Sequence, residues 1–209
     1  AMTAIITGFI ISFGSLFLAG QIANDMTNNF EDWYPTIVIW FLALALLLNY
    51  EDDRVLLGLK NRGLPGNLAI SISVGLVVLF GAAGIFDPLN ERAVSLFVIG
   101  TLYNLSREII KDVEDMDGDK GRNTYAMRVG ADKARLTSWV ILLITLVALL
   151  TPFAMGIFEL LHIIFIAPGL FTLMSVKKHI YLAEDTAASR MIKIAMTLTM
   201  VGLILAALI

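Results

Sequence analysis

The chain has 209 residues, of which 58% are hydrophobic and 16% charged, and its mean hydropathy is +0.82. This composition excludes an ordinary soluble domain and indicates a polytopic membrane protein, for which no nucleic-acid partner is expected. The formal net charge of −3 says little, because the placement of Lys and Arg decides orientation in a membrane. With no cysteine, disulfides and thiolate chemistry are excluded.

Apolar runs long enough, or nearly so, to cross a hydrocarbon core of about 30 Å recur along the chain. They lie at residues 2–23, 36–49, 67–86, 93–110, 136–155, 157–175 and 191–209. We therefore predict an all-α fold, a bundle of seven transmembrane helices in a single domain over residues 1–209. The second run is short for a span, and the pair Pro168-Gly169 should bend the sixth.

The Lys and Arg residues predict the orientation of this bundle. Counting crossings backward from the C-terminus places the loops 51–66, 111–135 and 176–190 on one face of the membrane. Every Lys and Arg except Arg92 lies within or beside these loops. By the positive-inside rule that face is cytoplasmic, which predicts a multi-pass protein of the cell membrane.

Two polar triplets share one spacing, and we name them the first triplet and the second triplet. The first consists of Asp25, Asn28 and Asp32, and the second of Asp112, Asp115 and Asp119. Spacing of i, i+3 and i+7 places three side chains on one helical face. Hard oxygen ligands suit Mg²⁺, which typically bridges carboxylates to substrate phosphates. We therefore predict one magnesium and diphosphate site, held between the two triplets at the ends of membrane helices.

Cations and an amide accompany the triplets. Arg107 and Lys111 lie one turn apart beside the second triplet and can reach diphosphate oxygens, while Asn24 extends the first triplet. Lys60 and Arg62 are ordinary cytoplasmic charges by default, and phosphate contacts if their loop covers the cavity. The alternative is that all these charges are simply solvated at helix ends, but ionisable groups at the end of a span are costly unless they are used.

The crossing count conflicts with a shared site. Carried through the run 36–49, it puts the first triplet on the face opposite the second. Either the triplets are unrelated, or an odd number of crossings is missing between Asp32 and Arg54. We favour the missing crossing, because the short run after Asp32 compresses the first half of the sequence. The start inside an apolar run similarly indicates a processed or truncated end, so we expect a first helix and a segment after about residue 28 to be lacking.

The segment Ser106–Asp119 resembles the second aspartate-rich motif of UbiA-type intramembrane prenyltransferases. Leu59–Asn67 resembles a segment of the archaeal ether-lipid branch, and residues 19–28 resemble the family's first motif. The resemblance implies nine transmembrane helices in two pseudo-symmetric halves, with both motifs at a cytoplasmic mouth. Seven visible helices agree with the loss of the family's first and third.

The resemblance also implies an activity. The donor would be a prenyl diphosphate, with geranylgeranyl as the group transferred, and the acceptor a lipid-like phosphate, geranylgeranylglyceryl phosphate, drawn from the membrane lipid. Mg²⁺ would bind Asp25 and the second triplet, and the catalytic set would be the second triplet with Lys111. Metal and cations would neutralise the charge growing on the departing diphosphate.

Two other functions compete with this one. An aromatic or quinone-precursor prenyltransferase differs only in its acceptor, and sequence separates the two poorly. A divalent-cation transporter would also use paired acidic residues, near the membrane midplane. Here the acids lie at helix ends, and the neighbouring Arg107 and Lys111 would repel a permeating cation but attract a phosphate. These features favour the enzyme.

Overall fold

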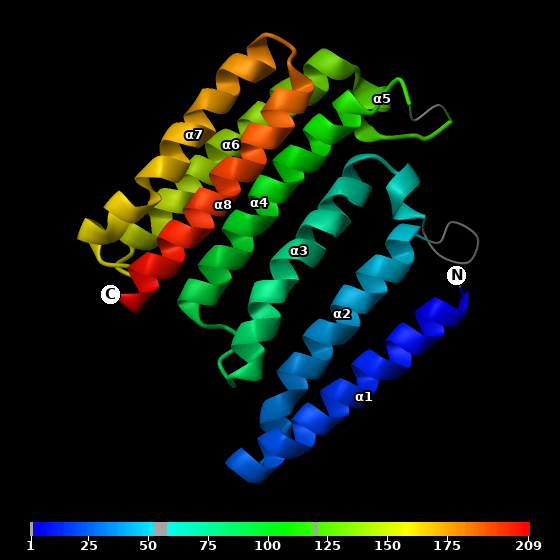
Figure 1. The fold of residues 1–209 in the computed structure, drawn as a ribbon, viewed down its shortest axis with the longest axis vertical. Coiled ribbons are helices and arrows are strands. Elements are labelled where there is room, and N and C mark those ends of the chain that lie inside the picture. The colour runs from blue at the N-terminus through cyan, green and yellow to red at the C-terminus, as the bar shows by residue number, and fades with distance from the viewer. Residues whose placement is uncertain (1, 52–57, 119–120) are drawn as a thin grey trace.

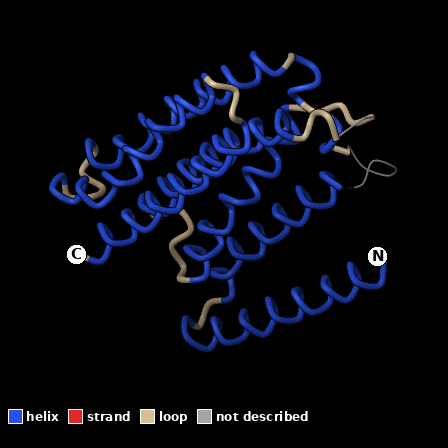
Figure 2. Tube along the Cα trace, turned by 45° about the horizontal axis from the view of Figure 1, so that its top comes forward, coloured by secondary structure: helices blue, strands red, loops and turns tan. Residues whose placement is uncertain are grey.

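The structure, a computed structural model, describes residues 2–51, 58–118 and 121–209, and in these ranges its regular elements are helices with no strand (Figure 2). The helices are α1 (Met2–Thr27), α2 (Tyr34–Glu51), α3 (Leu64–Gly84), α4 (Glu91–Glu114), α5 (Tyr125–Val129), α6 (Ala131–Ala154), α7 (Ile163–Tyr181) and α8 (Asp185–Leu208). Three short 3₁₀ turns join them, η1 (Phe30–Trp33), η2 (Leu59–Asn61) and η3 (Leu160–His162).

Seven helices of the described chain are long and apolar enough to cross a membrane, and α5 is the helix left out. The predicted number of spans is therefore confirmed, although several boundaries differ. The second span is a full helix rather than a short run, because Pro35 fits the first turn of α2. Polar residues extend α4 to Glu114 and start α8 at Asp185, and the sixth span runs from Leu160 to Tyr181, with α7 itself beginning at Ile163.

Helix α4 lies at the centre of the bundle, packed against α3, α6 and α8, and α7 packs against α8 (Figure 1). The largest core cluster belongs to this C-terminal half and includes the fully buried Tyr103, Leu142, Ile166 and Leu203. In contrast, α1 lies at the outer edge. It meets α2 mainly through aromatic rings, with Phe9 and Phe13 at 5.5 and 5.9 Å from Trp40 between ring centroids.

The consecutive spans alternate in direction, so the connections gather at two ends of the bundle (Figure 1). The end at the upper right of Figure 1 carries η2, α5, the last turn of α4 and the first turns of α3, α6 and α8. The opposite end carries η1 and the loops that follow α3 and α6. There the ring of Trp33 contacts that of Phe86 at 6.5 Å between centroids.

Candidate active site

Three helices converge on the carboxylate of Asp112. Asp112 lies in the last turn of α4 and is partly buried. The side-chain amide of Asn67, in α3, donates to Asp112 Oδ2 at 2.9 Å, and the backbone N–H of Tyr125, the first residue of α5, donates to the same oxygen at 3.3 Å. The carboxylate is therefore held by partners far apart in sequence.

The start of α3 explains how Asn67 reaches Asp112. Gly63, with φ of +66°, turns the chain into the helix, and Pro65 lies in its first turn, where no N–H is needed. Gly66 packs directly on the backbone carbonyl of Leu59, and a Cβ at that position would collide with it. This close packing brings the first turn of α3 against η2 and positions Asn67 toward α4.

The start of α5 is fixed in a comparable way. The buried hydroxyl of Thr124 caps the helix by accepting from the N–H of Met127 at 3.4 Å. Arg128 then ties α5 to η2 by donating to the carbonyl of Asn61 at 3.3 Å, and it also donates to the side chain of Asn123, just before α5, at 2.9 Å. The loop that contains Lys60 and Arg62 thus lies at the same end of the bundle as Asp112.

Other charged and polar groups surround the carboxylate. Arg107 Nη1 donates to Glu108 Oε1 at 2.8 Å, and Arg107 Nε is buried without a hydrogen-bond partner among the described residues. Lys111 is partly buried one turn further along α4. Tyr50, at the end of α2, hydrogen-bonds to Arg122 and lies within electrostatic range of Glu108 and Asp112. The site therefore combines carboxylates, cations and a phenol.

The second triplet is only partly as predicted. Helix α4 ends at Glu114, so Asp115 is its C-cap residue and is exposed, and the chain leaves the helix before Asp117. The prediction that the triplet occupies one helical face is wrong, because the helix ends before Asp115. The chain then forms a turn in which the N–H of Gly118 donates to the carbonyl of Asp115. Asp119 lies outside the described residues.

The first triplet lies at the opposite end of the bundle. Asp25 is exposed in the last turn of α1, Asn28 follows the helix with φ of +55°, and Asp32 in η1 accepts from Asn29 Nδ2 at 3.2 Å. Asn24 accepts from the N–H of Asn28 at 2.8 Å through its carbonyl. These residues share no helical face, and the fold does not bring them near Asp112. As the crossing count predicted, the two groups lie at opposite ends of the bundle in this chain, and a site shared between them stays a prediction for a longer chain.

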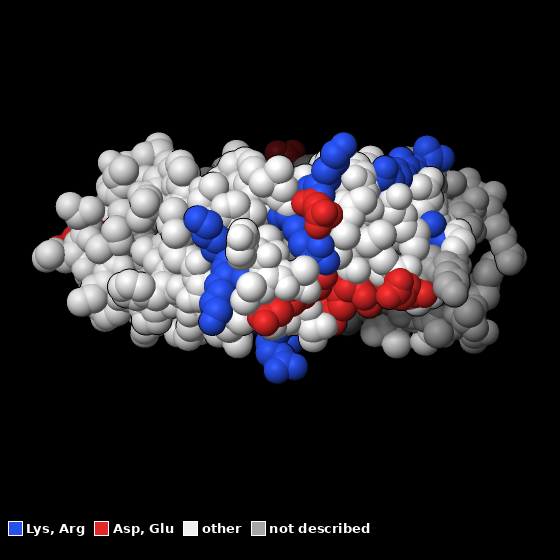
Figure 3. Space-filling view, turned by 90° about the horizontal axis from the view of Figure 1, so that it is seen from above, with Lys and Arg blue, Asp and Glu red and all other residues white. Residues whose placement is uncertain are grey.

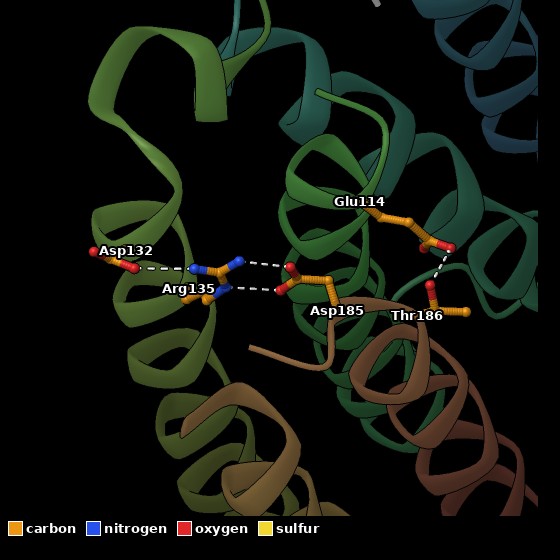
Figure 4. A network of polar contacts seen from close by, with 5 residues as sticks. All are labelled: Glu114, Asp132, Arg135, Asp185 and Thr186. Carbon is orange, nitrogen blue, oxygen red and sulfur yellow. Dashed lines mark hydrogen bonds and ion pairs between the residues drawn. The ribbon is translucent and has the colours of Figure 1, made fainter. Parts of the chain in front are cut away.

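An ion-pair network lies next to this end of α4 (Figure 4). Arg135, in α6, holds Asp185 of α8 with contacts of 2.6 and 2.8 Å and Asp132 of its own helix at 2.9 Å. Thr186 of α8 donates to Glu114 Oε1 at 2.9 Å. The network joins α4, α6 and α8 and borders an open cavity of about 810 Å³.

Seen end-on, acidic side chains form a continuous band with Lys and Arg on both sides of it (Figure 3). Among the described residues, no three acidic, His or Cys side chains gather closely enough to form a metal cage. Mg²⁺ does not need one, because it usually takes one or two carboxylates and completes its shell with water and substrate phosphates. The carboxylate of Asp112, held by two hydrogen bonds and close to other carboxylates, is therefore of the kind that could bind Mg²⁺ together with a diphosphate.

Sequence reasoning missed Asn67, Tyr50 and Glu108 as residues of this site. For Asn67 a signal was present: an amide at the start of an apolar span, directly after the glycine-rich turn, needs a hydrogen-bond partner. Tyr50 carried no comparable signal, because a tyrosine at the end of a span is ordinarily an interfacial anchor.

A helix bundle of this kind, with carboxylates and cations gathered at one end of its spans, defines a polytopic membrane protein with a polar site at the membrane surface. The chain belongs to the UbiA prenyltransferase family, whose profile matches residues 2–201.

Relatives in this family carry a common name. The chain is 30% identical over 166 residues to the digeranylgeranylglyceryl phosphate synthase of Haloquadratum walsbyi, covering 78% of this chain and 54% of the relative. It is 34% identical over 150 residues to that of Methanosarcina mazei, covering 70% and 52%. The chain thus spans about half the length of these curated relatives.

The fold also has a counterpart among solved structures. A structure from work on digeranylgeranylglyceryl phosphate synthase in membranes matches with a TM-score of 0.68 at 23% identity, covering 82% of this chain and 61% of that one. At this identity the match supports the helical fold.

Proposed function

We propose that this protein transfers a geranylgeranyl group from its diphosphate to geranylgeranylglyceryl phosphate, in a Mg²⁺-dependent reaction of membrane ether-lipid synthesis. The observation that carries the proposal is the Asp112 carboxylate, fixed by α3 and α5 at a helix end where Arg107 and Lys111 also lie. The names of the relatives give the product, digeranylgeranylglyceryl phosphate, and the substrates proposed here are those that the resemblance to the family implies.

Each group has a role in this reaction. Asp112 and Asp115, with Asp119, would hold Mg²⁺, which when bound neutralises part of the charge on the diphosphate. Arg107 and Lys111 would bind diphosphate oxygens directly and stabilise the charge that develops there. Lys60 and Arg62, on the loop at the same end, would add contacts to a phosphate group.

The transfer itself exchanges one C–O bond for another. The allylic C–O bond of the donor breaks and its electron pair leaves with the diphosphate. The hydroxyl oxygen of the acceptor forms the new C–O bond and releases its proton. The apolar faces of the spans would shield the reacting carbon from water and hold the isoprenoid chain, alongside membrane lipid.

The first triplet, with Asn24, joins the proposed site only if a further crossing brings it to the other end of the bundle. A longer chain of the family's nine-helix form would supply that crossing. We keep Asp25, Asn28 and Asp32 as proposed metal ligands on that condition. The gathering of Lys and Arg at the Asp112 end supports a cytoplasmic mouth in the cell membrane.

The test is transfer of labelled geranylgeranyl by the full-length protein purified in detergent, with and without Mg²⁺. Geranylgeranylglyceryl phosphate and 4-hydroxybenzoate are offered separately. Mg²⁺-dependent labelling of the first acceptor supports the proposal. Labelling of 4-hydroxybenzoate alone would move the protein to the aromatic prenyltransferases, and labelling of neither acceptor would reopen the cation-transporter alternative.

A further inference from the structure

Asn67 is a buried amide with a specific partner on another helix. The residue is 9% exposed, in the first turns of α3, and its Nδ2 donates to Asp112 Oδ2 at 2.9 Å. An unpaired amide in an apolar span is costly, because hydrocarbon offers no substitute for the lost hydrogen bond. The hydrogen bond to Asp112 therefore satisfies Asn67 and restrains the carboxylate at the same time.

Two neutral donors act on Asp112 Oδ2. The amide of Asn67 and the N–H of Tyr125 reach the same oxygen from α3 and α5. Neutral donors restrict rotation of a carboxylate without adding a positive charge that would compete with a cation. If the amide of Asn67 is removed, the N–H of Tyr125 remains, but the carboxylate loses the restraint that comes from α3.

The position of Asn67 is itself well fixed. The hydroxyl of Ser71 donates to the carbonyl of Asn67 at 2.6 Å, and Asn104 of α4 donates to that hydroxyl at 3.4 Å. Directly before Asn67, Gly66 is packed on the carbonyl of Leu59. The amide thus extends from a rigid helix start rather than from a free loop.

We propose that Asn67 is a positioning residue, which sets the orientation of the Asp112 carboxylate and thereby the affinity of this end of α4 for a divalent cation. The identity of that cation as Mg²⁺ rests on the proposed function. Partners of this kind, which orient a metal ligand without touching the metal, typically change metal affinity by about 10- to 100-fold when they are removed.

The test is direct binding of Mn²⁺, a spectroscopic substitute for Mg²⁺, to the full-length protein in detergent, followed by electron paramagnetic resonance without substrate. The variants are Asn67→Leu, which keeps the side-chain volume, Asn67→Ala and the conservative Asn67→Gln. The matched control is Ser73→Ala in the same helix, because the Ser73 hydroxyl bonds the carbonyl of Ala69 within that helix, at 2.9 Å.

We expect the Mn²⁺ dissociation constant to rise about tenfold in Asn67→Leu and Asn67→Ala. Asn67→Gln should recover part of the affinity, and Ser73→Ala should match the wild type. If Asn67→Ala fails to fold, the Mn²⁺ dissociation constant of the isosteric Asn67→Leu protein tests the inference. Wild-type Mn²⁺ affinity in a folded Asn67→Leu protein would overturn the inference and leave the proposed function standing. A wild-type protein that binds no Mn²⁺ would overturn both the inference and the metal site.

Discussion

At the scale of single residues, Arg135 makes ion pairs with two carboxylates that should contribute differently to stability. Its guanidinium binds Asp185 through two nitrogens and Asp132 through one. Asp185 is 13% exposed and Asp132 is 99% exposed, so water screens only the second contact strongly. The pair with Asp185 joins α6 to α8, and it should therefore contribute to stability.

We expect Asp185→Ala to lower the free energy of unfolding by about 2 kcal/mol, because it leaves a partly buried guanidinium without its bidentate partner. Thermal or denaturant unfolding in detergent measures the change. Asp132→Ala is the control, since it removes a carboxylate from the same guanidinium and should change stability much less. Equal effects of the two substitutions would contradict this account of the network.

At the residue scale the sequence singled out Asp112 because a charge stands out against an apolar background, and its role in the site stays a prediction. The sequence did not indicate the hydrogen-bond partners of Asp112, because these are common groups that reach the carboxylate only through the packing of the helices. Asn67 and the N–H of Tyr125 reach Asp112 only because α3 and α5 converge on the end of α4. A contact 45 residues apart in sequence depends on that convergence and cannot be derived from local spacing.

At the scale of helices, α7 and α8 are held together by close backbone approach. A Cβ on Gly169 would collide with Thr199, and a Cβ on Gly202 would collide with the carbonyl of Phe165. In a membrane the hydrophobic effect does not drive helices together, because lipid tails are as apolar as the side chains. Small residues of this kind therefore matter, because they let the helix backbones pack closely. In contrast, a Cβ on Gly81, in α3, would meet no atom within 4 Å.

Gly202→Ala should therefore destabilise the protein by about 1 to 3 kcal/mol, as overpacking does elsewhere. Gly81→Ala should leave stability unchanged or raise it slightly, because alanine is the better helix former and nothing opposes the added methyl group. The melting temperatures of the two variants in one detergent provide the comparison. A neutral Gly202→Ala would show that the α7 and α8 backbones are not in the contact described here.

The number of helices was predictable because an apolar run near the length of a membrane span is usually a transmembrane helix. Helix ends were less predictable, since polar residues continue α4 to Glu114 and start α8 at Asp185. The shared spacing within each triplet suggested a helical face that neither triplet occupies. In both cases the helix ends before the second residue of the triplet, at Thr27 and at Glu114.

At the scale of the whole molecule, the alternation of spans separates the two triplets. The sequence count predicted this separation, and the fold confirms it with η1 beside Phe86 and Asp112 at the other end. A further crossing between Asp32 and Arg54, in a longer form of the chain, stays a prediction.

The side of the membrane on which each end lies can be measured by cysteine labelling, because the 209-residue sequence contains no cysteine that would react in the background. In intact cells, Leu89→Cys should react with a membrane-impermeant maleimide, and Glu31→Cys should react as well unless a further crossing in the longer chain moves the first triplet to the other face. Asp117→Cys should react only after the membrane is permeabilised. All three residues are exposed, so differences in labelling report sidedness rather than burial. Labelling of Asp117→Cys from outside would reverse the orientation.

The central claim is that the charge of Asp112 serves a cation and diphosphate site, and Asp112→Asn tests it most directly. This substitution keeps the shape of the side chain and an oxygen acceptor for Asn67 and Tyr125, but removes the negative charge. The matched control is Asp117→Asn, an exposed carboxylate at the same end of the bundle.

The measurement is the rate of geranylgeranyl transfer to geranylgeranylglyceryl phosphate at saturating Mg²⁺. We predict a loss of about 100-fold or more for Asp112→Asn, typical of removing a group that stabilises the transition state, and little change for Asp117→Asn. A folded Asp112→Asn protein with wild-type activity would contradict the claim.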